Sequence, residues 1–215
     1  MRKRDTVMKK ALTLVLAILL CVGIFAGCSK KDSTIVLEGL PITAENASPY
    51  EGVYLENGDV EQVSSVYAMK FTNTGDQSVQ NAQLVFSDGT NELVFFLEML
   101  PAGKSVTVVE ANKLAATKAE IHYVDGTVTY IDAGLENVGC VEVTGDGPVQ
   151  VRNTTEDALP LVRIFYRKTD GNGNLIGGPC YSFMVDGIEA GATVDAEAEF
   201  WDESCEVVTV LVINE

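Results

Sequence analysis

The sequence has little positive charge and almost no histidine. Its 215 residues include 15 Lys and Arg against 31 Asp and Glu, and the formal net charge is −16. A chain this acidic is repelled by phosphate backbones, so we expect no nucleic-acid partner. The single histidine, His122, has no positioned nucleophile beside it, which argues against a hydrolytic triad. Ser-Lys or paired-carboxylate chemistry stays open because acidic residues are abundant, but no pair stands out. We expect no catalytic residues and no enzyme.

Cysteine pairs with metal-ligand spacing are also missing. Beyond residue 28 the chain has Cys140, Cys180 and Cys205, and their separations do not match a zinc pattern such as Cys-x-x-Cys. Three cysteines cannot all pair with one another. One bridge, Cys180–Cys205, fits an oxidising compartment, and buried free thiols fit the sequence at least as well.

The glycine-rich run at residues 170–174 starts like a calcium loop but does not complete one. Leu175 stands where the loop needs glycine for its sharp turn, and Tyr181 stands where it needs a glutamate ligand. A glycine-rich hairpin is the favoured interpretation. Acidic residues near the C-terminus could hold a weak cation, but solvated strand and loop positions explain them better: Glu197, Glu199, Asp202, Glu203 and Glu206. We expect no metal and no cofactor.

The N-terminus has the layout of a secretory leader. Residues 1–10 are rich in Lys and Arg, residues 11–26 form an apolar run interrupted only by Thr13, and small residues precede a cysteine in Phe25-Ala26-Gly27-Cys28. A basic start, an apolar stretch and a small-residue cut site are typical of a signal peptide. The apolar run is shorter than the ~20 residues that a transmembrane helix needs.

These last four residues resemble the bacterial lipobox, in which a lipidated cysteine becomes the first residue of the mature protein. The family usually has leucine where this chain has Phe25, another bulky apolar residue. The resemblance implies a signal peptide over residues 1–27, a palmitate-type lipid on Cys28 and a short tether over residues 28–33. It predicts an exported lipoprotein anchored to the cell membrane on its extracytoplasmic side, with cell-surface and periplasmic placement both open.

The body of the chain predicts β-strands. Tyr67, Met69 and Phe71 alternate with smaller or polar residues, which is the period of a half-buried strand. Residues 87–90 predict a turn, residues 93–97 the returning strand, and residues 205–213 a last strand. Residues 122–130 carry Asp-Gly between alternating residues, which predicts a hairpin. No segment has the helical period, so the composition favours β-sandwiches.

The body also contains an internal repeat. Phe71-Thr72-Asn73-Thr74 is matched eighty positions later by Val151-Arg152-Asn153-Thr154. Residues 100–106 resemble residues 188–194 at an offset of eighty-eight, so the second copy carries about eight extra residues in its middle hairpin. We expect an all-β protein of two tandem immunoglobulin-like sandwich modules, over residues 34–134 and 139–215.

The second copy resembles the FxLYD-type immunoglobulin-like module. The resemblance rests on Val149-x-Val151-x-Asn153-Thr154, then Val162-x-Ile164-x-Tyr166, then Gly173-x-Leu175-Ile176-Gly177, then Ile188-x-Ala190-Gly191. It covers residues 139–215 and, more weakly, 34–132, where the Gly-x-Leu-Ile-Gly part is missing. Such modules occur on bacterial surface proteins and lipoproteins. Their motif positions belong to turns and cores, so the resemblance implies a fold and no catalytic residues.

One strand of the second copy predicts a contact surface. Its outward residues form a basic and aromatic strip on an acidic body, made of Arg163, Phe165, Arg167 and Lys168. Charge pairing across the sheet, or protection of an edge strand, explains such residues as well. The favoured function is a non-catalytic adhesion, scaffold or binding module that contacts an envelope or surface protein. The alternative is capture of a small solute, glycan or cation between the modules, near residues 134–145. The sequence leaves the oligomeric state open.

Overall fold

The computed structural model describes residues 34–56, 59–132, 134–145, 148–169, 175–177 and 180–213. These residues belong to one compact unit that begins at Thr34. The leader at residues 1–27, Cys28, the tether and the loop at residues 170–174 lie outside the described residues. The all-β prediction is confirmed for the described part, whose only helical element is the 3₁₀ turn η1 (Val138–Cys140). In the same part of the chain, no helix has the length and apolarity to cross a bilayer.

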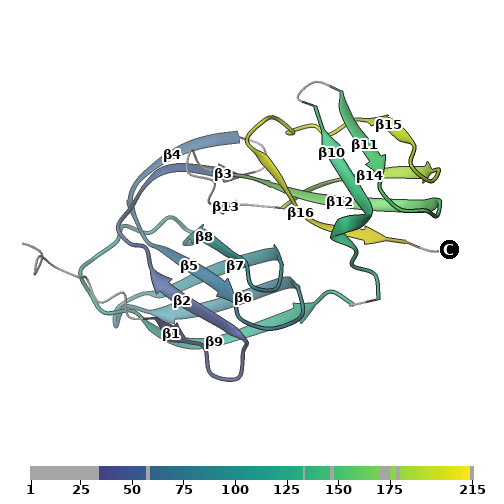
Figure 1. Ribbon diagram of the computed structural model, residues 1–215. Coiled ribbons are helices and arrows are strands. Elements are labelled where there is room, and N and C mark those ends of the chain that lie inside the picture. The colour runs from purple at the N-terminus through teal and green to yellow at the C-terminus, as the bar shows by residue number, and fades with distance from the viewer. Residues whose placement is uncertain are drawn as a thin grey trace, which may run out of the picture. The chain divides into compact units, whose positions relative to one another are not determined.

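Strands of the first half form two sheets that share one core (Figure 1). The first sheet has the order β1 (Ile35–Val36), β2 (Ile42–Asn46), β5 (Ala68–Asn73), β8 (Ser105–Val109). The second has the order β7 (Glu92–Leu100), β6 (Val79–Ser87), β9 (His122–Tyr130). A separate hairpin is made of β3 (Tyr50–Glu56) and β4 (Asp59–Val66). We call the described residues 34–132 the first repeat.

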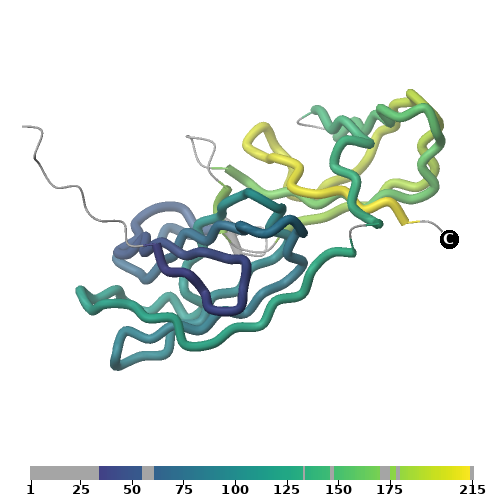
Figure 2. The backbone as a smooth tube through the Cα atoms, turned by 60° about the horizontal axis from the view of Figure 1, so that its bottom comes forward, coloured from purple at the N-terminus to yellow at the C-terminus, as the bar shows by residue number. Residues whose placement is uncertain are grey.

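The second half has the same strand order. Its first sheet is β10 (Val141–Thr144), β11 (Val149–Asn153), β15 (Thr193–Ala196), which matches β2-β5-β8. Its second sheet is β14 (Tyr181–Ile188), β12 (Leu159–Lys168), β16 (Cys205–Val212), which matches β7-β6-β9. We call the described residues from 134 onward the second repeat. Figure 2 follows the backbone through the first repeat, purple to teal, and then through the second, green to yellow.

Each repeat has a buried asparagine at the equivalent position. Asn73 and Asn153 are both fully buried. Each side-chain amide donates to the carbonyl four residues along the chain, at 2.8 Å from Asn73 and 2.7 Å from Asn153. Each also donates to the carbonyl that ends the next hairpin, of Leu100 or of Ile188, at 3.0 Å in both cases. The sequence match at Asn-Thr therefore marks a turn that one side chain ties to a distant strand.

Most of the expected strands and turns of the first repeat are confirmed. Tyr67, Met69 and Phe71 have no exposed surface and lie in its core. Gly89 and Gly103 have φ of 85° and 72°, the left-handed region that glycine adopts at little cost. The chain therefore reverses between β6 and β7, and again before β8, where the sequence predicts turns.

The hairpin predicted at Asp125-Gly126 is wrong. Both residues lie inside the single strand β9, which pairs along its length with β6. A Cβ on Gly126 would lie 2.8 Å from Leu84 Cδ2 and 3.1 Å from the carbonyl oxygen of Gln83. This glycine thus permits close packing of β9 on β6, a use of Asp-Gly that the local sequence does not distinguish from a turn.

The extra residues of the second repeat include a strand that joins the first repeat. β13 (Leu175–Ile176) runs parallel to β8, with Leu175 opposite Val106 and Ile176 opposite Thr107. Leu175 is 7% exposed and belongs to the core of the first repeat. The Leu-Ile-Gly motif that the first repeat lacks is therefore the segment that packs the second repeat onto it.

Candidate functional site

The basic strip of Arg163, Phe165, Arg167 and Lys168 does not form a free surface. Phe165 and Arg167 are only 5% and 3% exposed, so their predicted outward placement is wrong. Phe165 packs in the core of the first repeat, and Arg167 Nη2 donates to the Glu98 carbonyl on β7. This face of β12 meets the chain's own first repeat, a contact that the sequence of one repeat cannot disclose.

The two ends of the strip make local contacts. Arg163 remains exposed, with its guanidinium carbon 4.9 Å from the Phe165 ring centroid and its Nε and Nη2 donating to Ser182 Oγ at 3.2 and 3.1 Å. Lys168 is ion-paired with Asp202. Lys168 therefore fits the alternative explanation of the strip, in which its charges pair with acidic residues of the same chain.

The linker between the repeats is fixed by a carboxylate. Glu136 Oε1 accepts hydrogen bonds from Ser78 Oγ at 2.8 Å and from Thr209 Oγ1. Ser78 belongs to the first repeat and Thr209 to the second, and their exposures are 4% and 0%. The Glu136 carboxylate therefore links the two repeats. It lies within residues 134–145, where the sequence suggested that a small ligand could be captured.

The cysteines of the body are free thiols. Cys140 is buried, and Cys180 and Cys205 are half-buried, so the Cys180–Cys205 bridge is not formed. Burial raises the pKa of Cys180 to about 11. Burial also raises the pKa of Cys140 and of Cys205. These thiols are protonated at neutral pH and are poor nucleophiles.

The other sequence candidates form no site. His122 is exposed, and its Nε2 lies 4.0 Å from a Glu120 carboxylate oxygen. No group of three or more His, Cys, Asp or Glu side chains in the described residues is arranged to hold a metal ion. The acidic residues from Glu197 to Glu206 are therefore not gathered around a common point.

The second repeat contains a groove with a volume of about 770 Å³. It lies between the start of β14 and the segment that follows β15. Its walls carry four aromatic rings, those of Tyr166, Tyr181, Phe183 and Phe200. Two exposed carboxylates, Glu197 and Glu199, also line it. A concave aromatic surface with a few charged groups at its edge is the usual composition of a ligand site.

The rings of the groove are held by one another. Tyr166 is 1% exposed and lies at the centre, with ring centroids 5.5 Å from Tyr181, 5.9 Å from Phe183 and 5.1 Å from Trp201. Phe200 lies 5.0 Å from Tyr181. Such tilted and edge-to-face contacts each add about 0.5–1.5 kcal/mol beyond burial. The wall is therefore preformed.

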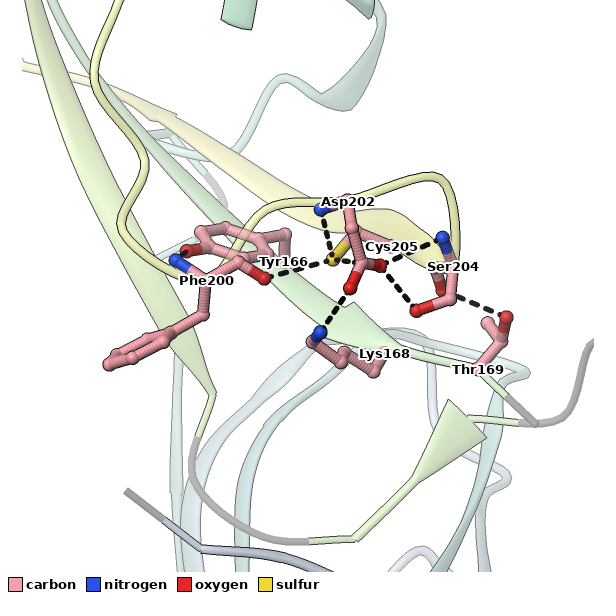
Figure 3. Close-up of polar contacts among 7 residues, drawn as sticks. All are labelled: Tyr166, Lys168, Thr169, Phe200, Asp202, Ser204 and Cys205. Atoms are coloured by element: carbon pink, nitrogen blue, oxygen red, sulfur yellow. Dashed lines mark hydrogen bonds and ion pairs between the residues drawn. The ribbon is translucent and has the colours of Figure 1, made fainter. Parts of the chain in front are cut away.

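The segment that carries Phe200 is fixed by polar contacts with the end of β12 (Figure 3). The Phe200 N–H donates to Tyr166 Oη at 3.3 Å. Asp202 pairs with Lys168 and accepts from Ser204 N at 2.9 Å. Burial on its own raises the pKa of Asp202, but the hydrogen bonds from Lys168 and Ser204 outweigh it and hold the pKa at about 2. Asp202 is thus an anion that anchors one wall of the groove.

The corresponding edge of the first repeat is closed. By the repeat offsets, Val94 corresponds to Ser182. The Val94 N–H donates to Glu110 Oε1 at 3.3 Å, and its carbonyl accepts from the Ala111 N–H at 2.9 Å. Glu110 is 1% exposed. At the position of Glu110 the second repeat has Ala198, which lines the groove. The second repeat thus lacks the carboxylate that accepts from the strand edge in the first repeat.

Sequence reasoning missed the groove: it considered Glu197 and Glu199 only as weak cation ligands, and it gave Tyr181 and Phe200 no binding role. They come from β14 and from a segment outside the strands, and no periodic pattern links them. The one available signal was the gathering of Phe200 and the only tryptophan, Trp201, beside two glutamates. No family model matches the chain, and no curated protein matches it either.

Proposed function

We propose that this chain is an extracytoplasmic lipoprotein, anchored through a lipid on Cys28, whose two immunoglobulin-like sandwiches form a non-catalytic binding module. The ligand occupies the aromatic groove of the second repeat. The observation that carries the proposal is the groove itself, which stays open where the first repeat closes the same edge. The ligand comes from an envelope or surface component, since the anchor holds the module at the membrane.

The anchor is supported by the sequence of the leader. A short apolar run ends at Ala26-Gly27-Cys28, and the residues that follow are polar. This layout suits peptidase cleavage in front of a lipidated cysteine better than it suits a membrane span. In the sequence only five residues separate Cys28 from Thr34, where the described residues begin.

The scaffold role is supported by the way the repeats are joined. Three contacts link the repeats. β13 pairs with β8, Arg167 donates a partly buried hydrogen bond to the Glu98 carbonyl, and the Glu136 carboxylate accepts from both repeats. A module that is rigid before binding loses less conformational entropy when it takes a ligand. The joined repeats therefore present the groove in a fixed setting.

Two experiments in intact cells test this proposal. Fractionation should find the protein in the membrane, Cys28→Ala should leave it without lipid, and globomycin, which blocks the peptidase that cuts after lipidation, should leave the leader uncleaved. A photo-reactive residue at Ala198, inside the groove, should crosslink a distinct envelope component. The same residue at Gln80, an exposed position of the first repeat, is the control. An amino terminus of the unmodified protein that mass spectrometry finds neither cleaved nor lipidated refutes the anchor, and identical products from the two positions refute the groove as the binding site.

A further inference from the structure

We propose that the groove binds an extended, basic peptide segment, which adds as a strand to the free edge of β14 at Ser182. This inference rests on the proposed function, because it names the class of ligand for the same groove. Three features carry it: the geometry of the closed edge in the first repeat, the backbone direction at Ser182, and the charge of the groove.

The first repeat shows how this edge is satisfied. Val94 lies opposite Val85 in the ladder of β7 and β6, and Ser182 lies opposite Phe165 in the ladder of β14 and β12. These two pairs are equivalent by the repeat offset of eighty for β6 and β12. The backbone N–H and C=O of Val94 point away from β6, since they bond to Glu110 and Ala111. The alternation of an antiparallel ladder then points the N–H and C=O of Ser182 away from β12.

No such closure forms in the second repeat. Ala198 has no carboxylate to accept from the Ser182 N–H. Within the described residues, the Ser182 backbone makes no hydrogen bond to the segment from residue 196 to 200, and β14 pairs with β12 alone. A strand edge with an outward donor and acceptor is the template for adding a peptide strand. The open groove beside Ser182 supplies the space for it.

The charge of the groove selects the peptide. Glu197 and Glu199 are exposed, line the groove and alternate with Ala198. The whole chain has a net charge of −16, which repels acidic partners before contact. Side chains of an added strand alternate, so apolar residues can meet Phe183 and Phe200 while basic residues meet the glutamates. The expected ligand is therefore a segment of alternating apolar and Lys or Arg residues.

The test is a fluorescence titration of the full chain in detergent. Trp201 is the only tryptophan and packs on Tyr166 and Phe183, so its emission reports on the groove. The blocked peptide Lys-Val-Lys-Val-Lys should give a saturable change. The same peptide with N-methylated valines lacks two backbone donors and should bind at least tenfold more weakly, and Glu-Val-Glu-Val-Glu should give no response. Equal binding of the methylated peptide overturns strand addition.

Two variants separate edge closure from simple charge attraction. Ala198→Glu copies the first repeat and should abolish binding of the basic peptide, because its carboxylate caps the Ser182 N–H. Thr193→Glu adds the same charge at an exposed position of β15 and should keep or strengthen binding. If Ala198→Glu strengthens binding as much as Thr193→Glu does, the edge is not the site. The peptide comparison on the unmodified protein decides the question if Ala198→Glu does not fold.

The outcomes also separate this inference from the proposed function. If no basic peptide changes Trp201 emission while crosslinking at Ala198 still captures a component, the ligand is of another class and the inference is wrong. If the groove is found to bind a small solute or glycan, the inference is likewise wrong. If neither method finds a ligand at the groove, the proposed function fails together with the inference.

Discussion

Replacing Gly177 with alanine should release β13 from the first repeat. A Cβ at this position would lie 2.5 Å from the Thr107 carbonyl oxygen and 2.9 Å from Val108 Cα. Both are backbone atoms of β8, which cannot move aside without breaking its pairing with β5. The strand β13 must therefore lift, and Leu175, now 7% exposed, leaves the core of the first repeat.

The expected loss of unfolding free energy is the sum of the lost leucine burial and the lost strand pairing. Exposing one buried leucine costs about 1.5–3 kcal/mol. The pairing of two residues adds about 1 kcal/mol, so Gly177→Ala should destabilise the fold by roughly 2.5–4 kcal/mol. With a urea m-value of about 2 kcal/mol/M, the unfolding midpoint should fall by roughly 1–2 M. Gly139→Ala is the matched control, because a Cβ at Gly139 meets nothing within 4 Å.

A chemical probe near the strand gives an independent measure. Cys180 follows β13 closely, and burial raises its thiol pKa to about 11, so it should alkylate slowly in the unmodified protein. Release of β13 should speed the alkylation of Cys180, measured by mass spectrometry of the labelled peptide, while Gly139→Ala leaves the rate unchanged. A midpoint and an alkylation rate for Gly177→Ala that match those of the control would show that β13 does not hold the repeats together.

Two further predictions concern the second repeat. Asn153→Ala removes the buried amide that donates to the carbonyls of Asp157 and Ile188 at 2.7 and 3.0 Å, so it should cost about 2–4 kcal/mol in urea unfolding; a loss below 1 kcal/mol contradicts the role of this amide. The folded-state pKa of Asp202, about 2, is below its ordinary value of 3.8, so its contribution to stability is present above pH 4 and lost as the pH falls to about 2. The melting temperatures of the unmodified protein and Asp202→Asn should therefore converge over that interval, and a constant difference down to pH 2 contradicts the assignment.

Local patterns in the sequence were sufficient to predict most strands. The alternation around Met69 and the turn at Gly89 reflect contacts within one repeat, and a short stretch of sequence contains the information for them. The hairpin prediction at Asp125-Gly126 was wrong because Gly126 is needed for close packing against Leu84, about forty residues away in the sequence. Contacts of that range leave no periodic trace in the local sequence.

The prediction of an exposed contact strip was wrong for a related reason. The alternation on β12 correctly places Arg163 and Phe165 on the face opposite the core of their own repeat, but it says nothing of what covers that face. The first repeat covers that face of β12. It buries Phe165, and its Glu98 carbonyl oxygen accepts a hydrogen bond from Arg167. The described structure therefore buries Phe165 and Arg167 inside the chain, where they are not available to an outside partner.

The eight or so residues that distinguish the second repeat explain this arrangement. They extend the middle hairpin and include β13, which covers the β8 edge of the first repeat. The first repeat is thereby closed twice, by β13 along β8 and by Glu110 at Val94 of β7. The second repeat keeps the shared turn of Asn153 but has Ala198 in place of Glu110, and its edge stays open. In the described residues one copy of the repeat thus closes its edges, and the other leaves free the strand edge at which we propose that the ligand binds.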